Sequence, residues 1–392
     1  MALSSNPVVG LVGWRGMVGS VLMDRMQAEG DFALIEPLFF STSNAGGAAP
    51  RQAKNETKLF DANDIAALKR CDVVITAQGG EYTKAVYPQL RAAGWKGYWI
   101  DAAKTLRMND DAVIILDPVN LPVIQNALSR GVKDYVGGNC TVSCMLMGLG
   151  ALFKADLVEW MTATTYQAAS GGGAQHMREL LTQYGTLNAA VKPLLDDPAS
   201  AILEIDRQVA ATQRGLSAEE TKNFMVPLGG SLIPWIDTDR GDGTSLEEWK
   251  GGAETNKILG RGPGFAGTTA IPIDSTCVRV GAMRCHSQSL TIKLKQNVPL
   301  ADVEHMIRAD KAQAMYRLGV SEEVANVVDQ LSPSQLMKIA SANQLICRFR
   351  FDDEVVWSLL SEHGKRATPG VDANAARLHA SIVMAGNFAE AV

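Results

Sequence analysis

Short apolar runs alternate with helix-like segments through the first 140 residues, and this alternation restricts the fold more than any other feature of the chain. Several of the runs are apolar on both faces, as parallel strands covered by helices on both sides would be. The alternation predicts an α/β fold with a Rossmann-like, doubly wound sheet. The expected strands are Val8 to Val12, Pro37 to Phe40, Asp72 to Thr76, Gly97 to Asp101, Ala112 to Leu116 and Tyr135 to Val136.

A glycine-rich turn follows the first expected strand. Gly13, Gly16 and Gly19 separate that strand from an expected helix over Ser20 to Glu29. Backbone N–H groups at the start of such a helix can hold a pyrophosphate. The spacing is a variant of the usual fingerprint, and its position after the first strand predicts a dinucleotide site.

The second expected strand ends in hydroxyl side chains. Ser41, Thr42 and Ser43 stand there, with no acidic residue to accept the hydroxyls of a ribose. An acidic side chain at this point favours NAD, whereas hydroxyls with Arg15 nearby can receive a 2′-phosphate. We therefore predict NADP as the cofactor. The same segment also fits a simple polar loop.

The pattern changes from about residue 155 onwards and predicts an α+β catalytic and dimerisation domain. A chain of 392 residues exceeds what one hydrophobic core normally serves, which also favours two domains. We expect an NADP-binding domain over 1–139, the catalytic domain over 140–330 and a C-terminal segment over 331–392. The expected elements of the second domain are strands at Thr162 to Ala168, Thr276 to Val280 and Ser287 to Lys295, and a helix over Met177 to Tyr184.

Cys140 is the main candidate for chemistry. It follows Gly137, Gly138 and Asn139 and begins an apolar, helix-like stretch. Unpaired N–H groups and the positive end of the helix dipole favour a thiolate, so we expect a nucleophile with a lowered pKa. The same N–H groups could stabilise an oxyanion.

The other cysteines fit small buried hydrophobic positions better than reactive ones. Cys140 and Cys144 could join a metal site with two later residues, but their spacing is not that of a usual zinc knuckle. Those later residues, Cys285 and His286, would point to opposite faces of a strand. We therefore predict no metal site. The cysteines assigned to the core are Cys71, Cys277, Cys347 and, one turn into the apolar stretch, Cys144.

Two polar residues in the second half match the needs of a thiolate enzyme. His286 is the best candidate acid/base, because only histidine has an unperturbed pKa near neutrality. Arg279, expected on the same strand, is a candidate carboxylate clamp, since a guanidinium forms paired hydrogen bonds with that group. A surface arginine is the open alternative. The remaining histidines fit structural or solvated positions.

Charge and composition limit the partners. The formal net charge is -5, and no long basic run appears, which argues against a nucleic-acid or membrane-surface role. Met1 to Pro7 lacks the features of an export signal, and no stretch reaches the length of a membrane span. Six irregularly spaced cysteines do not form a disulfide framework. We expect a soluble, cytoplasmic protein that acts on small molecules.

Long motifs follow one another in order between residues 8 and 295. They are Gly13 to Met23, Phe39 to Ser43, Gln78 to Gly80, Leu116 to Asn120, Gly137 to Ser143, Tyr166 to Gly171, Gly230 to Asp237, Glu247 to Lys250 and Cys277 to Gln288. Together they resemble the motifs of the aspartate-β-semialdehyde dehydrogenases, particularly the bacterial branch. The resemblance implies reversible, NADPH-dependent reductive dephosphorylation of L-4-aspartyl phosphate to L-aspartate 4-semialdehyde, at the branch that leads to lysine, diaminopimelate, methionine and threonine. It also implies a homodimer.

The resemblance also implies roles for individual residues. Cys140 would be the nucleophile that forms a thioester, His286 the acid/base, and Gln167 the residue that orients the intermediate. Arg279 would bind the substrate carboxylate and Glu247 its amino group. The implied phosphate site is Arg107, Asn139 and Lys250. The implied cofactor contacts are Gly13, Arg15, Gly16, Met17, Val18, Gly19, Ser41, Thr42, Ser43, Gln78, Ser170 and Gly171.

Some alternatives remain open. Glu247 and Lys250 also fit an i,i+3 ion pair on a helix surface, which the residues alone favour. After about Pro299 the family's usual ending is not matched, and a late helix, Asp353 to Leu360 or Ala373 to Ala385, is expected to cover the nucleotide domain instead. An acyl-phosphate reductase for another acidic amino acid, or a non-catalytic NADP-binding protein, would share most of these features.

Overall fold

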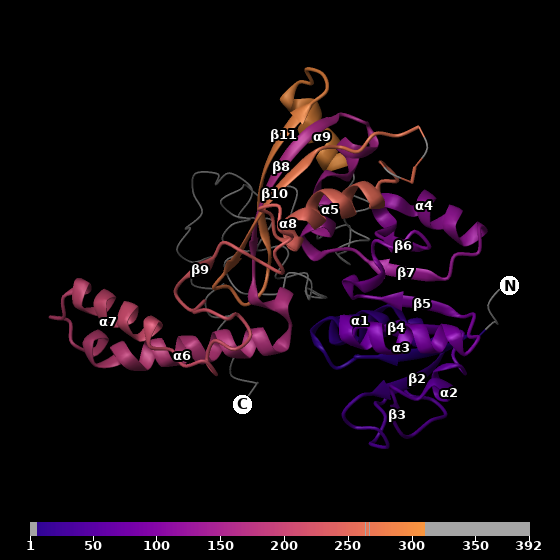
Figure 1. The fold of residues 1–392 in the computed structure, drawn as a ribbon, viewed down its shortest axis with the longest axis horizontal. Coiled ribbons are helices and arrows are strands. Elements are labelled where there is room, and N and C mark those ends of the chain that lie inside the picture. The colour runs from indigo at the N-terminus through magenta and orange to yellow at the C-terminus, as the bar shows by residue number, and fades with distance from the viewer. Residues whose placement is uncertain (1–5, 263, 266, 310–392) are drawn as a thin grey trace, which may run out of the picture. The chain divides into compact units, whose positions relative to one another are not determined.

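The computed structural model describes residues 6–262, 264–265 and 267–309. The chain separates into two units, Met1–Val298 and Pro299–Val392. The first contains a seven-stranded sheet and a four-stranded sheet (Figure 1), which confirms a Rossmann-like α/β part joined to an α+β part. Of the second unit, the described residues include α9 (Leu300–Ala309). The late helices expected near Asp353 and Ala373 lie outside the described residues.

All neighbouring strands of the larger sheet are parallel, in the order β3-β2-β1-β4-β5-β7-β6. The order reverses between β1 and β4, and open sheets of this kind bind ligands where neighbouring connections diverge, at the carboxyl ends of the strands. The strands are β1 (Val8–Val12), β2 (Glu36–Ser41), β3 (Phe60–Asp61), β4 (Val73–Thr76), β5 (Tyr98–Asp101), β6 (Ala112–Ile115) and β7 (Asp134–Gly137).

Both faces of this sheet are buried, because neighbouring residues along each strand enter different cores. On β2, Leu38 and Phe40 pack with side chains of α3, whereas Phe39 packs with Met23 and Met26 of α1. The apolar runs of the sequence are therefore explained by two cores on one sheet. The helical segments are α1 (Met17–Glu29), η1 (Asp31–Leu34), α2 (Ile65–Leu68), α3 (Gly80–Ala92), η2 (Lys104–Leu106) and α4 (Asp117–Ser129).

The smaller sheet is mixed, in the order β11-β8-β10-β9. β8 (Val158–Gln167) pairs parallel with β10 (Ile273–Val280) and antiparallel with β11 (Ser287–Leu294), while β9 (Leu232–Ile233) is antiparallel to β10. Helices α5 (Cys140–Lys154) and α8 (Leu246–Ile258) pack together and against this sheet. β8 leaves Trp160 and Tyr166 exposed.

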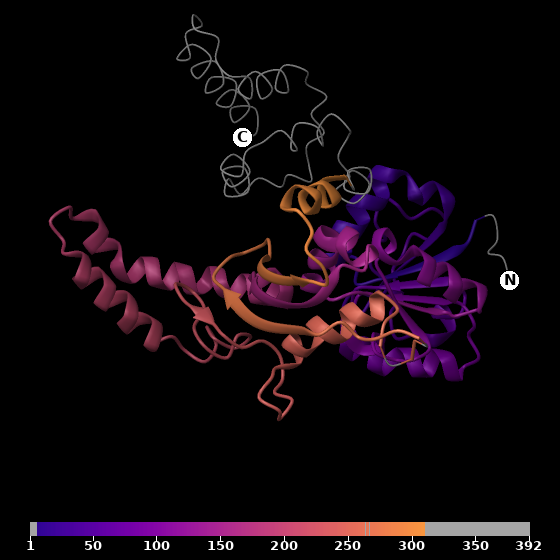
Figure 2. The same ribbon diagram turned by 90° about the horizontal axis from the view of Figure 1, so that it is seen from above.

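The remaining helices form a hairpin of two long elements. α6 (Ala174–Asp196) follows the short turn η3 (Ala169–Gly172), and α7 (Ile202–Arg214) runs back along it (Figure 2). Among the described residues, no helix combines the length and apolar character needed to cross a bilayer.

The predicted strands are confirmed, with shifts of one or a few residues at their ends. One placement was wrong: Cys285 and His286 lie between β10 and β11, so His286 does not share a strand with Arg279. Cys285 there has a φ of 72°, which no extended strand adopts. Helices α7 and α8 were not among the elements predicted for the second domain. The predicted domain limits stay a prediction.

Candidate active site

Cys140 is the first residue of α5, and Asn139 caps that helix. The Asn139 side-chain oxygen accepts hydrogen bonds from the backbone N–H groups of Thr141 (2.9 Å) and Val142 (3.2 Å). This cap fixes the start of the helix and therefore the position of the thiol. It also occupies two of the N–H groups that the sequence suggested for an oxyanion.

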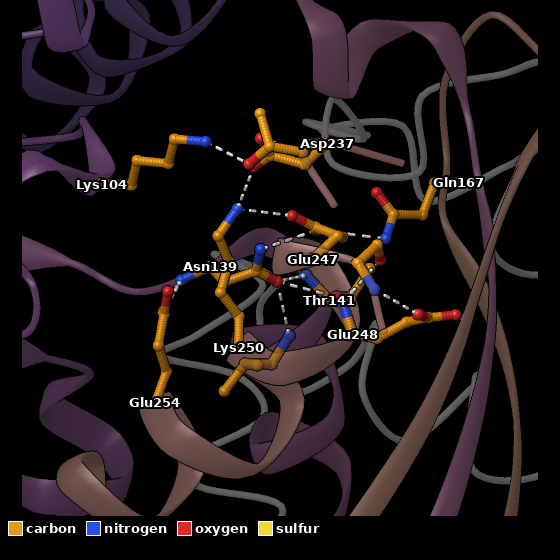
Figure 3. Close-up of polar contacts among 12 residues, drawn as sticks. Lys104, Asn139, Thr141, Gln167, Asp237, Glu247, Glu248, Lys250 and Glu254 are labelled. Carbon is orange, nitrogen blue, oxygen red and sulfur yellow. Dashed lines mark hydrogen bonds and ion pairs between the residues drawn. The ribbon is translucent and has the colours of Figure 1, made fainter. Parts of the chain in front are cut away.

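The carboxylate of Glu247 contacts three other predicted site residues (Figure 3). Its Oε1 accepts hydrogen bonds from the side-chain amides of Asn139 (2.8 Å) and Gln167 (3.2 Å), and its Oε2 pairs with the Lys250 ammonium at 2.7 Å. Gln167 ends β8, so the cluster joins α5, β8 and α8. The structure thus brings four predicted site residues into direct contact.

Helix geometry sets the spacing of Glu247 and Lys250. A capping box between Ser245 and Glu248 fixes the start of α8, and the two charged residues then lie one turn apart. Their side chains are each only 7% exposed, so the interpretation as a surface ion pair was wrong. Burial opposes ionisation of Glu247, but the charge and hydrogen bonds of Lys250 outweigh it and lower the Glu247 pKa. Both groups are therefore charged at neutral pH.

The thiol of Cys140 does not have the lowered pKa that we predicted. Cys140 retains solvent exposure, yet protein atoms crowd its sulfur. That burial, followed by the negative charge of Glu247, raises the pKa of the thiol. The Thr141 backbone N–H and the charges of Arg107 and Arg279 act in the opposite direction without reversing the shift. In the ligand-free protein the thiol is therefore protonated at neutral pH.

Arg279 and His286 are joined through the backbone of Ala168. The buried Arg279 donates from Nη1 to the Ala168 carbonyl at 2.8 Å, and the Ala168 N–H donates to Nδ1 of His286 at 3.0 Å. A Cβ added at Gly171 would lie 3.0 Å from Arg279 Nη1 and 3.2 Å from His286 Nε2. The two side chains therefore converge on the same glycine, although they belong to different segments.

The hydrogen bond at Nδ1 also defines the state of the His286 ring. Because Nδ1 accepts, the neutral ring carries its proton on Nε2. Burial, and then the positive charge of Arg279, lowers the pKa of His286. His286 in this arrangement is a neutral donor at Nε2, and acting as a base would require it to exchange its bond with Ala168.

Arg107 is committed to the protein. Its Nε donates to the Gly137 carbonyl (2.7 Å), its Nη1 to Glu254 (3.1 Å) and its Nη2 to the Ala102 carbonyl (3.1 Å). Glu254 in turn accepts from the Asn139 backbone N–H at 2.7 Å. Arg107 thus braces the segment that precedes Cys140, and its predicted contact with phosphate stays a prediction.

The predicted cofactor residues divide between two places. The first place is the carboxyl end of β1, β2 and β4, where Arg15 Nη2 donates to the Ser41 hydroxyl (3.0 Å) and Gln78 donates to the Thr42 hydroxyl (3.2 Å). Gly13 has a φ of 72°, and a Cβ there would lie 2.6 Å from the Gln78 nitrogen. A side chain at this position would clash with the segment after β4, so only glycine fits here, and N–H groups at the start of the following helix can hold a pyrophosphate. The residues nearby are Gly16, the N-cap of α1, then Met17, Val18 and Gly19 in its first turn, and Ser43 after β2.

Ser170 and Gly171 occupy the second place. They lie in η3, beside Arg279 and His286, in the smaller-sheet part of the chain. The Ser170 N–H donates to the Met283 carbonyl at 3.0 Å. Their predicted contact with the cofactor would therefore have to be made from the catalytic side.

Three charged residues at this site, Glu254, Asp237 and Lys104, were not predicted from the sequence. Glu254 anchors Asn139 and Arg107, and Asp237 forms ion pairs with Lys250 (2.7 Å) and Lys104. Asp237 lies within a quoted family motif, but nothing in its neighbourhood in the sequence marks a partner 133 residues away. Among the described residues, no group of three or more His, Cys, Asp or Glu side chains could hold a metal ion.

The raised thiol pKa predicts how Cys140 should react. In ligand-free protein, alkylation of Cys140 by iodoacetamide should accelerate only as pH rises past the ordinary thiol value of about 8.5. Glu247→Gln removes the neighbouring negative charge and should speed alkylation at pH 8 by about three- to tenfold, because one pKa unit is a factor of ten. Mass spectrometry of the labelled peptide measures the rate.

Glu204→Gln, on the exposed surface of α7, is the matched control and should leave the rate unchanged. A labelling rate that reaches its plateau below pH 7 would show a lowered thiol pKa instead.

Known proteins match both parts of the chain. Residues 8–127 match a family model described as semialdehyde dehydrogenase, NAD binding domain, and residues 149–359 match one described as semialdehyde dehydrogenase, dimerisation domain. The second match continues past residue 295, where the quoted motifs end.

Solved structures of aspartate semialdehyde dehydrogenases are also similar to this chain. Aspartate semialdehyde dehydrogenase from Francisella tularensis is 42% identical, covering 77% of this chain and 80% of that one, with a TM-score of 0.71. Aspartate semialdehyde dehydrogenase II from Vibrio cholerae, complexed with ASA, is 22% identical, covering 77% of this chain and 79% of that one, with a TM-score of 0.59. Aspartate semialdehyde dehydrogenase with NADP from Candida albicans is 17% identical, covering 80% of this chain and 79% of that one, with a TM-score of 0.50.

The two weaker likenesses support the fold alone. The family models, however, match residues 8–127 and 149–359, which is most of the chain, and the Francisella enzyme shares two-fifths of its aligned residues with this chain. The chain therefore belongs to the semialdehyde dehydrogenase family and is an oxidoreductase of the aspartate semialdehyde dehydrogenase type.

Proposed function

We propose that this enzyme catalyses the reversible reductive dephosphorylation of L-4-aspartyl phosphate to L-aspartate 4-semialdehyde and phosphate, with NADPH. The observation that carries the proposal is the cluster around Cys140, in which a thiol at a capped helix start lies within electrostatic reach of buried Glu247 and Arg279. An anion and a cation at one thiol suit a substrate that carries both an ammonium and a carboxylate group. The Vibrio relative was solved with ASA bound.

Each end of such a substrate has a partner. Arg279 offers a guanidinium whose Nη1 is braced by Ala168, leaving its remaining N–H groups for a carboxylate. The Glu247 carboxylate can bind the ammonium group of the substrate. To do so it gives up some of the hydrogen bonds that it accepts from Asn139 and Gln167. Lys250 is then released from Glu247 and can bind the phosphate.

The proposed reaction proceeds through Cys140. Its thiolate attacks the acyl carbon of aspartyl phosphate, a C–S bond forms, and phosphate leaves with the electrons of the C–O bond. NADPH, when bound at the glycine-rich turn, supplies the hydride that reduces the thioester. His286 donates from Nε2 to the oxygen that becomes negatively charged. The oxyanion then collapses to the aldehyde, the C–S bond breaks, and its electrons leave with Cys140 as the thiolate that began the reaction.

We further propose NADP as the preferred cofactor, since Arg15 and Ser41 meet where a 2′-phosphate would lie. Arg15→Ala should raise the KM for NADPH by about 10- to 100-fold, the range for a charge-assisted hydrogen bond, and leave the KM for NADH nearly unchanged. Steady-state kinetics with both cofactors measure this. Arg25→Ala, which removes a surface ion pair with Glu29 on the following helix α1, is the control. A wild-type preference for NADH would refute the assignment.

A homodimer is proposed as the working form. The family model for residues 149–359 is a dimerisation domain, and the smaller sheet exposes the large side chains of Trp160 and Tyr166. Exposed aromatic side chains of this kind mark protein interfaces. We also propose that the enzyme is cytoplasmic and that its product leads to the biosynthesis of lysine, diaminopimelate, methionine and threonine.

The deciding experiment is direct. L-aspartate 4-semialdehyde is added to the enzyme with NADP and with or without inorganic phosphate, and NADPH formation is followed. The proposal expects turnover only with phosphate. Activity confined to a longer semialdehyde would instead identify a related acyl-phosphate reductase, and NADP binding without any turnover would identify a non-catalytic protein.

A further inference from the structure

Two lysines from distant parts of the chain meet at one oxygen atom. Lys250 on α8 and Lys104 at the start of η2 both form ion pairs with Oδ2 of Asp237, Lys250 at 2.7 Å (Figure 3). The other carboxylate oxygen of Asp237 accepts from the Thr238 N–H at 2.9 Å. Because both ammonium groups bond the same atom, they are neighbours, although Lys104 follows the larger sheet and Lys250 packs with the smaller one.

Asp237 is held tightly in this position. Its φ of 72° is unusual for a residue with a side chain, and such strain persists where surrounding contacts fix it. Burial opposes its ionisation, yet its bonds to Lys104 and Lys250 lower the Asp237 pKa well below the usual range. Asp237 is therefore an anion that holds two cations at a defined place.

The charges of this group balance only while substrate is absent. Lys104, Asp237, Lys250 and Glu247 alternate in sign along the chain of ion pairs. Once Glu247 is neutralised by a substrate ammonium group, the two lysines share the single carboxylate of Asp237. One positive charge is then left over, which suits an anion.

The two lysines differ in freedom. The Lys250 side chain is 7% exposed, whereas that of Lys104 is 48% exposed and can move toward a ligand. Arg107 donates once to the protein from each guanidinium nitrogen, which fixes its position and leaves one hydrogen on each of Nη1 and Nη2. A phosphate dianion beside Lys250 carries two charges, so the neighbouring Lys104 can supply a second ammonium group in addition to any contact from Arg107.

We propose that Lys104 is a second cation of the phosphate subsite, which Asp237 holds beside Lys250 until phosphate binds. The inference rests on the proposed function, since it assigns a residue to the phosphate that the reaction releases or consumes. The competing explanation is an ion pair that only joins η2 to the segment before α8.

The test is Lys104→Gln in the phosphate-dependent oxidation of aspartate semialdehyde. The KM for phosphate should rise about tenfold or more, while the KM for the semialdehyde changes less than twofold. Lys104→Arg, which keeps the charge, should restore most of the phosphate affinity. Lys84→Gln, which breaks a surface pair on α3, should change neither KM. Should Lys104→Gln fold poorly, Lys104→Met keeps the apolar stem and replaces it.

A binding measurement separates this inference from the proposed function. Inorganic phosphate should raise the melting temperature of the wild type and do so much less for Lys104→Gln. A variant with a lower melting temperature but an unchanged phosphate KM and an unchanged phosphate-induced shift would overturn the inference. Wild-type turnover that needs no phosphate would overturn the proposed function, and the melting shift would still decide whether Lys104 binds phosphate.

Discussion

Replacing Cys140 by serine is expected to lower turnover by at least about a thousandfold, because removing a covalent nucleophile leaves only the binding contribution to catalysis. A serine hydroxyl is a far poorer nucleophile than a thiolate, because its pKa lies far above that of a thiol and much less of its anion forms. Phosphate-dependent NADPH formation measures the loss. Unchanged NADP affinity and melting temperature would show that the fold is retained.

Cys144→Ser is the matched control on the same helix. Cys144 lies one turn further along α5 and is exposed, so its predicted place in the core was wrong. Neighbouring protein atoms raise the pKa of its thiol as well, and among the described residues no charged group acts on it as Glu247 acts on Cys140. Most of the turnover should therefore remain. Near-normal turnover of Cys140→Ser would rule out a covalent thioester on this residue.

The sequence predicted the fold and the position of the thiol because both depend on local patterns. Strands that are apolar on both faces define a sheet between two cores, as Leu38 and Phe39 show by packing in different clusters. The glycines after β1 and Asn139 before α5 act within a few residues of themselves. Patterns of this kind are visible without any knowledge of tertiary contacts.

The rest of the site depends on contacts between distant segments. Glu247 and Lys250 looked like a surface pair because burial cannot be read from an i,i+3 spacing. The helix start favours a thiolate, but burial and Glu247, 107 residues further along the chain, reverse the shift of the Cys140 pKa. The ion pair of Lys104 with Asp237 likewise exists only in the folded chain.

The arrangement of charges also separates two kinds of substrate contact. Under the proposed function Arg279 binds the substrate carboxylate and Glu247 the substrate ammonium group, whereas Lys250 and Lys104 both pair with Asp237. Mutations in the two sets should therefore act on different substrates. Lys250→Ala should raise the phosphate KM more than the semialdehyde KM.

Arg279→Ala is expected to lower kcat/KM for the semialdehyde by about 30- to 5,000-fold, corresponding to the roughly 2–5 kcal/mol lost when a buried charge pair is broken. The guanidinium is buried and oriented by the Ala168 carbonyl, so water cannot replace it as a partner for the substrate carboxylate. Arg279→Lys keeps the charge but loses the planar fork, and should recover only part of the activity.

Arg240→Ala removes an exposed arginine that pairs with Asp242, and should have little effect. The phosphate KM should change far less than the semialdehyde KM in Arg279→Ala. Equal losses for both substrates would mean that Arg279 only supports the segment from Ala168 to His286, because displacing Ala168 and His286 would slow the chemistry whichever substrate is varied. The ratio of the two KM values therefore distinguishes a carboxylate clamp from a structural arginine, which total activity cannot do.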